Sequence, residues 1–231
     1  MIHLWTLVIP PRLETDKGQG LVSLLSSEEQ GRYQKIGHER RRIEYLLSHA
    51  LLRLQGAEAL GLEPKQLPLR WVEGKKPVLE GLNHYVSLSH KKDLVAAALA
   101  PVPVGIDLEV VEESRFAAEI VRRFFSEREQ EAVLNLEGAG RSLRFPQLWS
   151  LKEALFKATD HPIETIFRET SFAIGKDAGV TFASRLPGLE PSEWQFQFLN
   201  PRPAHVLALA VRSRVPLPVQ EKPLQIEELF G

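Results

Sequence analysis

The sequence contains no cysteine, and this absence removes several kinds of chemistry together. A chain without thiols has no disulfides, no cysteine nucleophile, no cysteine-based zinc site and no iron–sulfur cluster held by its own ligands. It also lacks an apolar run long enough to cross a membrane, and its short apolar beginning is typical of a strand. These absences predict a cytoplasmic protein with no membrane partner.

An excess of one charge is absent too, because 29 Lys and Arg residues face 30 Asp and Glu residues, for a formal net charge of -1. No global field would recruit nucleic acid, so we expect no nucleic-acid partner, and any phosphate site must be local. What the chain does have is an ordinary globular mixture of 43% hydrophobic and 26% charged residues. Its 231 residues suffice for one large domain or two smaller ones.

The apolar pattern predicts an α+β fold. Apolar residues at three- and four-residue spacing within 39–55, followed by Gly56, indicate a helix that ends near that glycine. Pro146 suits the first turn of another helix, over 146–158. We expect three further helices, one that starts at 26–29 and two that cover 114–124 and 126–136. We expect strands at 3–9, 69–72, 84–88, 94–100, 170–174, 180–183, 194–199 and 205–212, and another that begins at 104.

The two parts of the sequence resemble each other weakly. In each, one helix precedes several short strands, and an apolar strand followed by prolines comes late, at 94–100 and at 205–211. This order predicts a duplication, with residues 1–102 and 103–231 forming two similar α+β halves related by pseudo-twofold symmetry. We expect the active site in the cleft between the halves. Chance similarity between short apolar strands is the alternative.

The first of two acidic motifs is Val104-Gly-Ile-Asp-Leu-Glu109. On a strand, Asp107 and Glu109 point to the same side, because side chains alternate with a period of two. Two like charges side by side are unfavourable unless a cation or hydrogen bonds neutralise them. An exposed strand edge is the alternative interpretation of this motif.

The second acidic motif, Trp149-Ser-Leu-Lys-Glu-Ala-Leu-Phe-Lys157, places Glu153 and Lys157 on one helix face. A surface ion pair between them is the simpler interpretation. Together with the first motif, however, the helix completes a set of three carboxylates from separate elements. Such a set suggests a hard cation, Mg2+ above all, and chemistry on a phosphate ester.

Three basic segments offer donors for phosphate through charge, hydroxyl and imidazole groups. They are Gly74-Lys-Lys-Pro77, Val86-Ser-Leu-Ser-His90 and His38-Glu-Arg-Arg-Arg42. Solvated turns and a solvated helix face are the alternatives.

Taken in order, the basic and acidic motifs resemble those of the 4'-phosphopantetheinyl transferase superfamily. The length and two-part organisation are similar to its surfactin-synthetase-activating type, a pseudo-dimer in a single chain. The similarity spans residues 26–175, and Phe124-Phe-Ser-Glu-Arg-Glu129 also resembles the family's segment between its two acidic motifs.

The resemblance implies an Mg2+ ion on the pyrophosphate of coenzyme A, held by Asp107, Glu109 and Glu153. It implies that Lys157 contacts phosphate and offsets charge on the leaving group. The residues that it assigns to coenzyme A are Lys76 at the nucleotide end, Ser89 and His90 at the phosphates, and Arg32 and Arg41 as N-terminal basic contacts. Lys76 is preferred to Lys75 because it directly precedes Pro77.

The implied reaction is the transfer of the 4'-phosphopantetheine arm to a serine of an apo acyl or peptidyl carrier protein, in fatty-acid biosynthesis or secondary metabolism. 3',5'-ADP is released, and either Glu153 or metal-bound water accepts the serine proton. We expect a monomer that docks the carrier on its C-terminal half, at 114–125, with Arg122 or Arg123. An Mg2+-dependent phosphohydrolase and a non-catalytic module that binds coenzyme A or a nucleotide are the alternatives.

Overall fold

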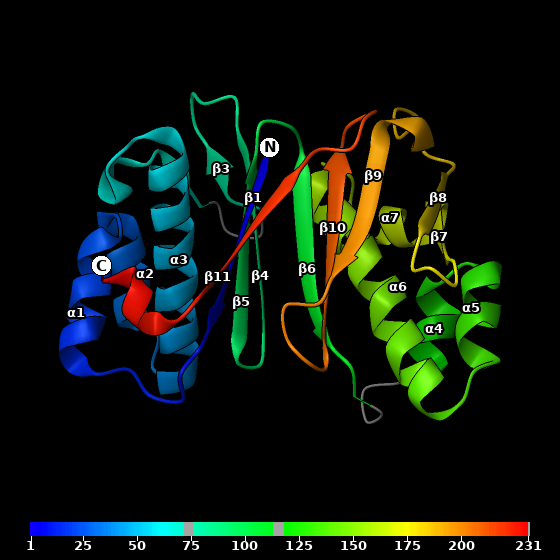
Figure 1. The fold of residues 1–231 in the computed structure, drawn as a ribbon, viewed down its shortest axis with the longest axis horizontal. Helices are drawn as coiled ribbons and strands as arrows, with labels where there is room; N and C mark the ends of the chain where they lie inside the picture. Colours follow the sequence, from blue (N-terminus) through cyan, green and yellow to red (C-terminus); the bar gives the residue numbers. More distant parts are fainter. Residues whose placement is uncertain (72–75, 113–117, 231) are drawn as a thin grey trace. The chain divides into compact units, whose positions relative to one another are not determined.

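The computed structural model describes residues 1–71, 76–112 and 118–230, which form two compact units (Figure 1). The first unit contains Met1–Val102 and Leu217–Gly231, and the second contains Pro103–Pro216. Each unit combines helices with small sheets, so the predicted α+β class is confirmed. Among the described residues, none of the helices has the length and apolar composition that membrane crossing requires.

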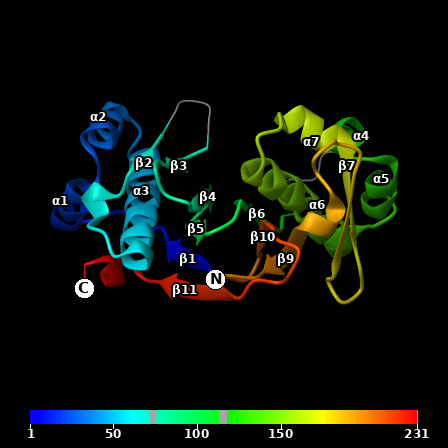
Figure 2. The ribbon, with the colours of Figure 1, turned by 90° about the horizontal axis from the view of Figure 1, so that it is seen from above.

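The first unit is built on a four-stranded sheet with the order β11-β1-β5-β4. The central strand β5 runs antiparallel to both of its neighbours, whereas β11 runs parallel to β1. Helices α1, α2 and α3 lie on one face of this sheet (Figure 2), and a short β2–β3 hairpin follows a 3-10 turn, η1. The bounds are β1 Ile2–Val8, α1 Thr15–Leu24, α2 Ser27–Lys35, α3 Glu39–Leu60, η1 Pro64–Gln66, β2 Leu69–Arg70, β3 Val78–Leu79, β4 Tyr85–Lys91, β5 Leu94–Ala100 and β11 Val219–Leu224.

Helix α3 contributes more residues to the first core than any other element, because its apolar stripe packs on β5 and β1. The predicted end of this helix at Gly56 was wrong, since α3 continues to Leu60. Gly56 lies inside the helix against Leu67, where an added Cβ would lie 2.6 Å from the leucine side chain and displace it. The helix ends instead at Gly61, whose φ of 66° is the left-handed conformation that glycine adopts without strain.

The second unit is built on a three-stranded antiparallel sheet with the order β6-β10-β9. Helix α6 packs on β6 and β10, and α4, α5 and α7 lie beside it on the same face (Figure 2). A separate hairpin joins β7 to β8. The bounds are β6 Val104–Val110, α4 Ala118–Phe124, α5 Glu127–Leu134, α6 Gly138–Ala158, α7 Ile163–Glu169, β7 Thr170–Ile174, β8 Val180–Ser184, β9 Trp194–Leu199 and β10 His205–Arg212.

Several further features depart from the predictions, among them helix α7, which was not predicted. Helix α6 begins at Gly138, so Pro146 lies inside it and not in its first turn. Helix α1 was missed, because Gly18 and Gly20 lower its helix propensity. Strand β11 was also missed, and through its pairing with β1 the segment 217–231 belongs to the first unit, although the predicted boundary placed it in the second half. Its Pro223 is tolerated because β11 is an edge strand.

Candidate functional site

The first acidic motif lies on β6, an edge strand of the second sheet. Gly105, Asp107 and Glu109 occupy alternate positions and therefore share one face. Their neighbours across the ladder on β10 include Ala208 and Ala210, which belong to the core beneath α6. Small residues thus line the face on which the helix rests, and Asp107, although charged, is only 5% exposed.

Gly105 explains how the second acidic motif reaches the first. A Cβ at this position would overlap the carbonyl oxygen of Ala154 and lie 2.7 Å from the nitrogen of Ala158. The last turns of α6 therefore sit directly on β6, closer than any side chain would allow. As a result Lys157 reaches across to Asp107, and its Nζ lies 2.7 Å from Oδ1.

The Asp107–Lys157 pair is partly buried, with 8% of the Asp107 side chain and 22% of the Lys157 side chain exposed. Lys157 was predicted to share a helix face with Glu153, one turn earlier, and the pairing shows that this face is the one turned toward β6. Glu109 and Glu153 are both half-buried. The structure thus brings the two acidic motifs together within one unit.

The donor set of these motifs fits Mg2+ by its chemistry, because carboxylate oxygens are the ligands that this hard cation prefers. The described ranges hold no ready-made group of three or more His, Cys, Asp or Glu side chains placed to bind a metal ion. Mg2+ usually takes only one or two carboxylates and completes its shell with water and substrate phosphate. Asp107, Glu109 and Glu153 therefore fit a site that the substrate would complete.

Lys152, next to Glu153, holds α6 in place and was missed by the sequence analysis. Its side chain is fully buried, and Nζ lies 3.1 Å from Glu129 Oε2 and donates to the carbonyls of Phe167 and Thr170. Burial lowers the pKa of Lys152, and the charge of Glu129 opposes this shift. The available signal was its position on the apolar stripe of the helix, in line with Leu148 and Leu155.

The Glu129 carboxylate joins three elements. It accepts from the nitrogen of Ser126 at 2.8 Å, which closes a capping box at the start of α5. It also accepts from the nitrogen of Phe172, on β7, at 2.9 Å, besides contacting Lys152 of α6. A fixed carboxylate under α6 therefore sets the rotation of the helix that presents Glu153 and Lys157.

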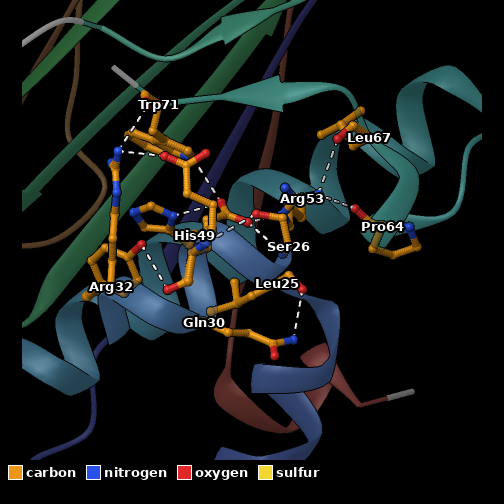
Figure 3. Close-up of polar contacts among 12 residues, drawn as sticks. Leu25, Ser26, Gln30, Arg32, His49, Arg53, Pro64, Leu67 and Trp71 are labelled. Carbon is orange, nitrogen blue, oxygen red and sulfur yellow. Dashed lines mark hydrogen bonds and ion pairs between the residues drawn. The ribbon is translucent and has the colours of Figure 1, made fainter. Parts of the chain in front are cut away.

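A buried carboxylate of the same kind, Glu29, lies in the first unit. Figure 3 labels its partners Ser26, His49, Arg53 and Trp71. It closes a capping box with Ser26 at the start of α2, and Oε2 accepts from Arg53 of α3 at 2.6 Å. Its other oxygen, Oε1, accepts from Trp71 Nε1 and lies 2.9 Å from His49 Nδ1. Burial would raise the pKa of Glu29, but the hydrogen bonds with His49 and the Ser26 nitrogen and the charge of Arg53 lower it to about 2.

The residues predicted to bind coenzyme A lie in the first unit and are spread over several elements. Ser89 and His90 are neighbours on β4, so they point to opposite faces, and Ser89 is buried while His90 is exposed. Arg40 donates to the carbonyl of Lys92 at 2.6 Å and thereby ties the start of α3 to the β4–β5 turn. The exposed Arg41 therefore lies at the same end of the unit as His90.

Arg32 and Lys76 lie near the β2–β3 hairpin. The Arg32 guanidinium donates to Glu28 at 2.7 Å and to the carbonyl of Trp71 at 3.1 Å. Lys76 precedes β3, while Gly74 and Lys75 of the same motif lie outside the described residues.

The predicted docking segment is partly described. Arg122 and Arg123 are exposed on α4, and Arg123 lies over the ring of Phe124. That ring makes edge contacts with Trp149 and Phe167, so this aromatic residue is used in packing. Two other members of the segment, Arg115 and Phe116, lie outside the described residues.

Comparison with known proteins gives consistent results. A family described as the 4'-phosphopantetheinyl transferase superfamily matches residues 103–210. The chain is 30% identical to the 4'-phosphopantetheinyl transferase HetI of Nostoc sp. over 68% of each protein. It is 31% identical to psf-1 of Bacillus pumilus, over 73% of this chain and 70% of psf-1. It is 26% identical to Sfp of Bacillus subtilis, over 63% of this chain and 64% of Sfp. Both of these proteins are also named as 4'-phosphopantetheinyl transferases.

Proposed function

The chain belongs to the 4'-phosphopantetheinyl transferase superfamily, and on this basis we propose which of its residues carry out each part of the reaction. It is an enzyme that transfers a 4'-phosphopantetheine arm. The proposed donor is coenzyme A, and the proposed acceptor is a serine of an apo acyl or peptidyl carrier protein. The observation that supports this most is the contact between Asp107 and Lys157, which joins the two acidic motifs.

Asp107, Glu109 and Glu153 are the proposed residues for Mg2+, on the donor chemistry described above. When bound, the ion would neutralise pyrophosphate oxygens and stabilise the 3',5'-ADP leaving group. Asp107 would then share its carboxylate with the ion, and its contact with Lys157 would weaken. The substrate supplies the compensation, because its phosphate oxygens offer Lys157 a new anionic partner. We infer that the ammonium passes from Asp107 toward phosphate as coenzyme A binds.

The serine hydroxyl of the carrier attacks the β-phosphorus, a bond forms between serine oxygen and phosphorus, and the bond to the bridging pyrophosphate oxygen breaks. The hydroxyl proton must go to a base within hydrogen-bond reach. Glu153 is one candidate because it is half-buried on the helix face turned toward β6. Water at the metal is the other, and both stay open. Lys157 offsets the charge that develops on the leaving phosphate.

In the first unit, Lys76, Ser89, His90, Arg41 and Arg32 are the proposed contacts to coenzyme A. Their ammonium, hydroxyl, imidazole and guanidinium groups are suited to phosphate oxygens. Arg32 uses one of its terminal nitrogens for Glu28 and Trp71, so it would reach phosphate through the others. Arg41 is more accessible than Arg32, because Arg41 is exposed whereas Arg32 is half-buried.

The two units are proposed to be copies of one ancestral unit. In each, a central strand, β5 or β10, runs antiparallel to both neighbours and carries the long helix of the unit on one face. In each, a capping-box glutamate, Glu29 or Glu129, contacts a buried cation of that helix, Arg53 or Lys152. Repetition of so specific an arrangement supports duplication. The pseudo-twofold relation and the cleft concern the placement of one unit relative to the other, and they stay predictions.

Carrier docking beside α4 also stays a proposal, with Arg122 and Arg123 as its basic residues, because carrier proteins of this kind are usually acidic. A monomer is expected, since the chain would supply both halves of the site.

The experiment that tests the function incubates the protein with coenzyme A, Mg2+ and an apo carrier protein, and reads the carrier by mass spectrometry. The carrier should gain the mass of one phosphopantetheine arm, and chelation of the metal should stop the gain. No gain across several fatty-acid and peptide-synthetase carriers would contradict the proposal. Consumption of coenzyme A without any carrier would instead indicate a phosphohydrolase.

A further inference from the structure

Trp71 is held to the body of the first unit through its indole N–H, its ring and its carbonyl (Figure 3). Nε1 donates to Glu29 Oε1 at 2.9 Å, and Arg32 donates to the Trp71 carbonyl at 3.1 Å. The indole ring stacks on His49 with centroids 4.0 Å apart, and Tyr45 stacks on the same imidazole at 3.8 Å. Three different parts of this one residue are therefore held by the body of the unit.

The place of Trp71 in the chain shows what these contacts hold. Trp71 directly follows β2, in which Arg70 pairs with Val78 of β3. Extending this register by one residue sets Trp71 across the hairpin from Pro77, and Lys76 comes directly before that proline. Among the described residues, Pro77 and Lys76 are therefore the ones that come next to the point at which Trp71 is fixed.

The β2–β3 ladder itself gives this end little support. Leu69 and Leu79 are buried and anchor the other end in the core. The ladder is only two residues long on each strand, and such a pairing is marginal by itself. The ion pair between Arg70 and Glu80 is exposed on both sides, and pairs of that kind contribute only about 0–1 kcal/mol.

The anchor under Trp71 is rigid because several donors share the Glu29 carboxylate. Arg53 binds its other oxygen and also donates to the carbonyls of Pro64 and Leu67, so η1 is fastened to the same point. A carboxylate held in this way, 1% exposed and charged, has no freedom to follow a moving hairpin. Trp71 must therefore stay where Glu29 holds it.

We propose that Trp71, held by Glu29, is a positioning residue for Lys76, and that it fixes the backbone beside Pro77 so that the lysine is in place before coenzyme A arrives. The inference rests on the proposed function, which assigns Lys76 to the nucleotide end of coenzyme A. Fixing the backbone beforehand removes an ordering cost from binding, and this raises affinity without adding a contact. A purely structural role for Trp71 would change the stability of the fold and leave the affinity for coenzyme A unchanged.

The test compares the unaltered protein with Trp71→Phe, Lys76→Ala and the double variant. Coenzyme A binding is measured by calorimetry, and kcat and KM are measured with a carrier. Trp71→Phe keeps an aromatic ring but loses the N–H, and we expect about tenfold weaker binding. We expect kcat at saturating coenzyme A to stay within about twofold, because no reacting group is altered. In the double variant, binding should be no weaker than in Lys76→Ala, since the two residues act through one contact.

The matched control is Arg70→Ala, which removes the exposed ion pair with Glu80 on the same hairpin and leaves the contacts of Trp71 with Glu29 and His49 intact. It should leave coenzyme A binding unchanged. Trp71→Leu, which also lacks the indole N–H and brings no other donor, replaces Trp71→Phe if that variant does not fold. The inference is overturned by additive losses in the double variant, by an equal loss in Arg70→Ala, or by unchanged binding in Trp71→Phe or Lys76→Ala. Failure of the proposed function would show differently, as absence of transfer by the unaltered protein.

Discussion

Single side chains in this protein are placed by partners that lie far away in the sequence. Lys157 is fifty positions from Asp107, and Glu29 is twenty or more from His49 and Arg53. The Asp107–Lys157 and Glu29–Arg53 pairs are largely shielded from water, so their charges interact more strongly than those of an exposed ion pair. Their removal should therefore have consequences that the removal of a surface charge does not have.

Lys157→Ala should lower kcat by about 100- to 1000-fold, because it removes a cation from the charge that develops on the leaving phosphate. The variant should remain folded, although Asp107 loses a partner, at a cost of about 1–3 kcal/mol in unfolding free energy. Transfer kinetics and thermal unfolding together measure both effects. Lys222→Ala is the control, since Lys222 also pairs with a carboxylate at 2.7 Å, that of Glu58, but on the surface of the first unit. Equal activity of Lys157→Ala and the parent would leave Lys157 with only a structural role.

Acid should weaken the first unit through Glu29. Its pKa is lowered from 4.5 to about 2 in the folded protein, so its stabilising contribution is complete above pH 4.5 and is lost as the pH falls toward 2. The expected loss is about 3 kcal/mol. The pKa of His49 is lowered by burial, and this adds a loss that begins below pH 6.5. The unfolding free energy of Glu29→Gln, measured from pH 7 to 2, should fall less steeply than that of the parent.

The control for this measurement is Glu39→Gln, an exposed acid at the start of α3. Its pH profile should follow that of the parent. If Glu29→Gln also follows the parent, the four contacts on the Glu29 carboxylate do not stabilise its charged form.

At the scale of the elements, the decisive contact is that of α6 on β6. Gly105, Ala208 and Ala210 leave room for the helix, while Lys152 and Glu129 fix it from its other side. The helix is therefore held on two sides, and Glu153 and Lys157 are presented from a rigid element. Sites on rigid elements are more accurately placed than sites on loops.

Gly105→Ala should displace α6, because the new methyl group meets backbone atoms of Ala154 and Ala158, which cannot rotate away. We expect a loss of about 2–3 kcal/mol in unfolding free energy, together with a large loss of transfer activity. Gly140→Ala on the same helix is the matched control. It makes only ordinary contacts with Leu136, so it should raise the unfolding free energy by about 0.5–1 kcal/mol. A stable and active Gly105→Ala would show that the close approach is dispensable.

The elements also show what the sequence can and cannot predict. The strand with Asp107 and the helix with Glu153 have strong local patterns, and both were predicted, as were β7, β9 and β10 within a residue. Helix α1 and strand β11 were missed because glycines, or a proline among polar residues, obscure their patterns. The contacts of Glu29 and Glu129 were missed for another reason. Each glutamate closes a capping box, and in the sequence this pattern predicts an exposed helix start. The buried cation that each one contacts comes from another helix, so only the tertiary fold brings the two together.

At the scale of the whole molecule, the chain forms two separate hydrophobic cores, one in each unit. One core contains Leu47, Leu51 and Val95 and includes Leu224 and Leu229 from the last residues of the chain. The other contains Leu148, Leu155 and Phe172. The first unit is therefore completed only when segment 217–231 returns to it from the second unit. A destabilising substitution within 217–231 should therefore destabilise residues 1–102, and it should not destabilise the second unit, which directly precedes that segment in the sequence.

Leu224→Ala tests this organisation, because Leu224 is 4% exposed and pairs with Leu7 of β1 across the β11–β1 ladder. Truncation of a buried leucine costs about 2–5 kcal/mol, and the loss should fall on the first unit. Hydrogen exchange should show lost protection in β1 and β5 with unchanged protection in β9 and β10. Leu148→Ala, in the core of the second unit, should give the reverse pattern. Equal loss of protection in both units by either variant would mean that the two cores unfold as one, in spite of their separate packing.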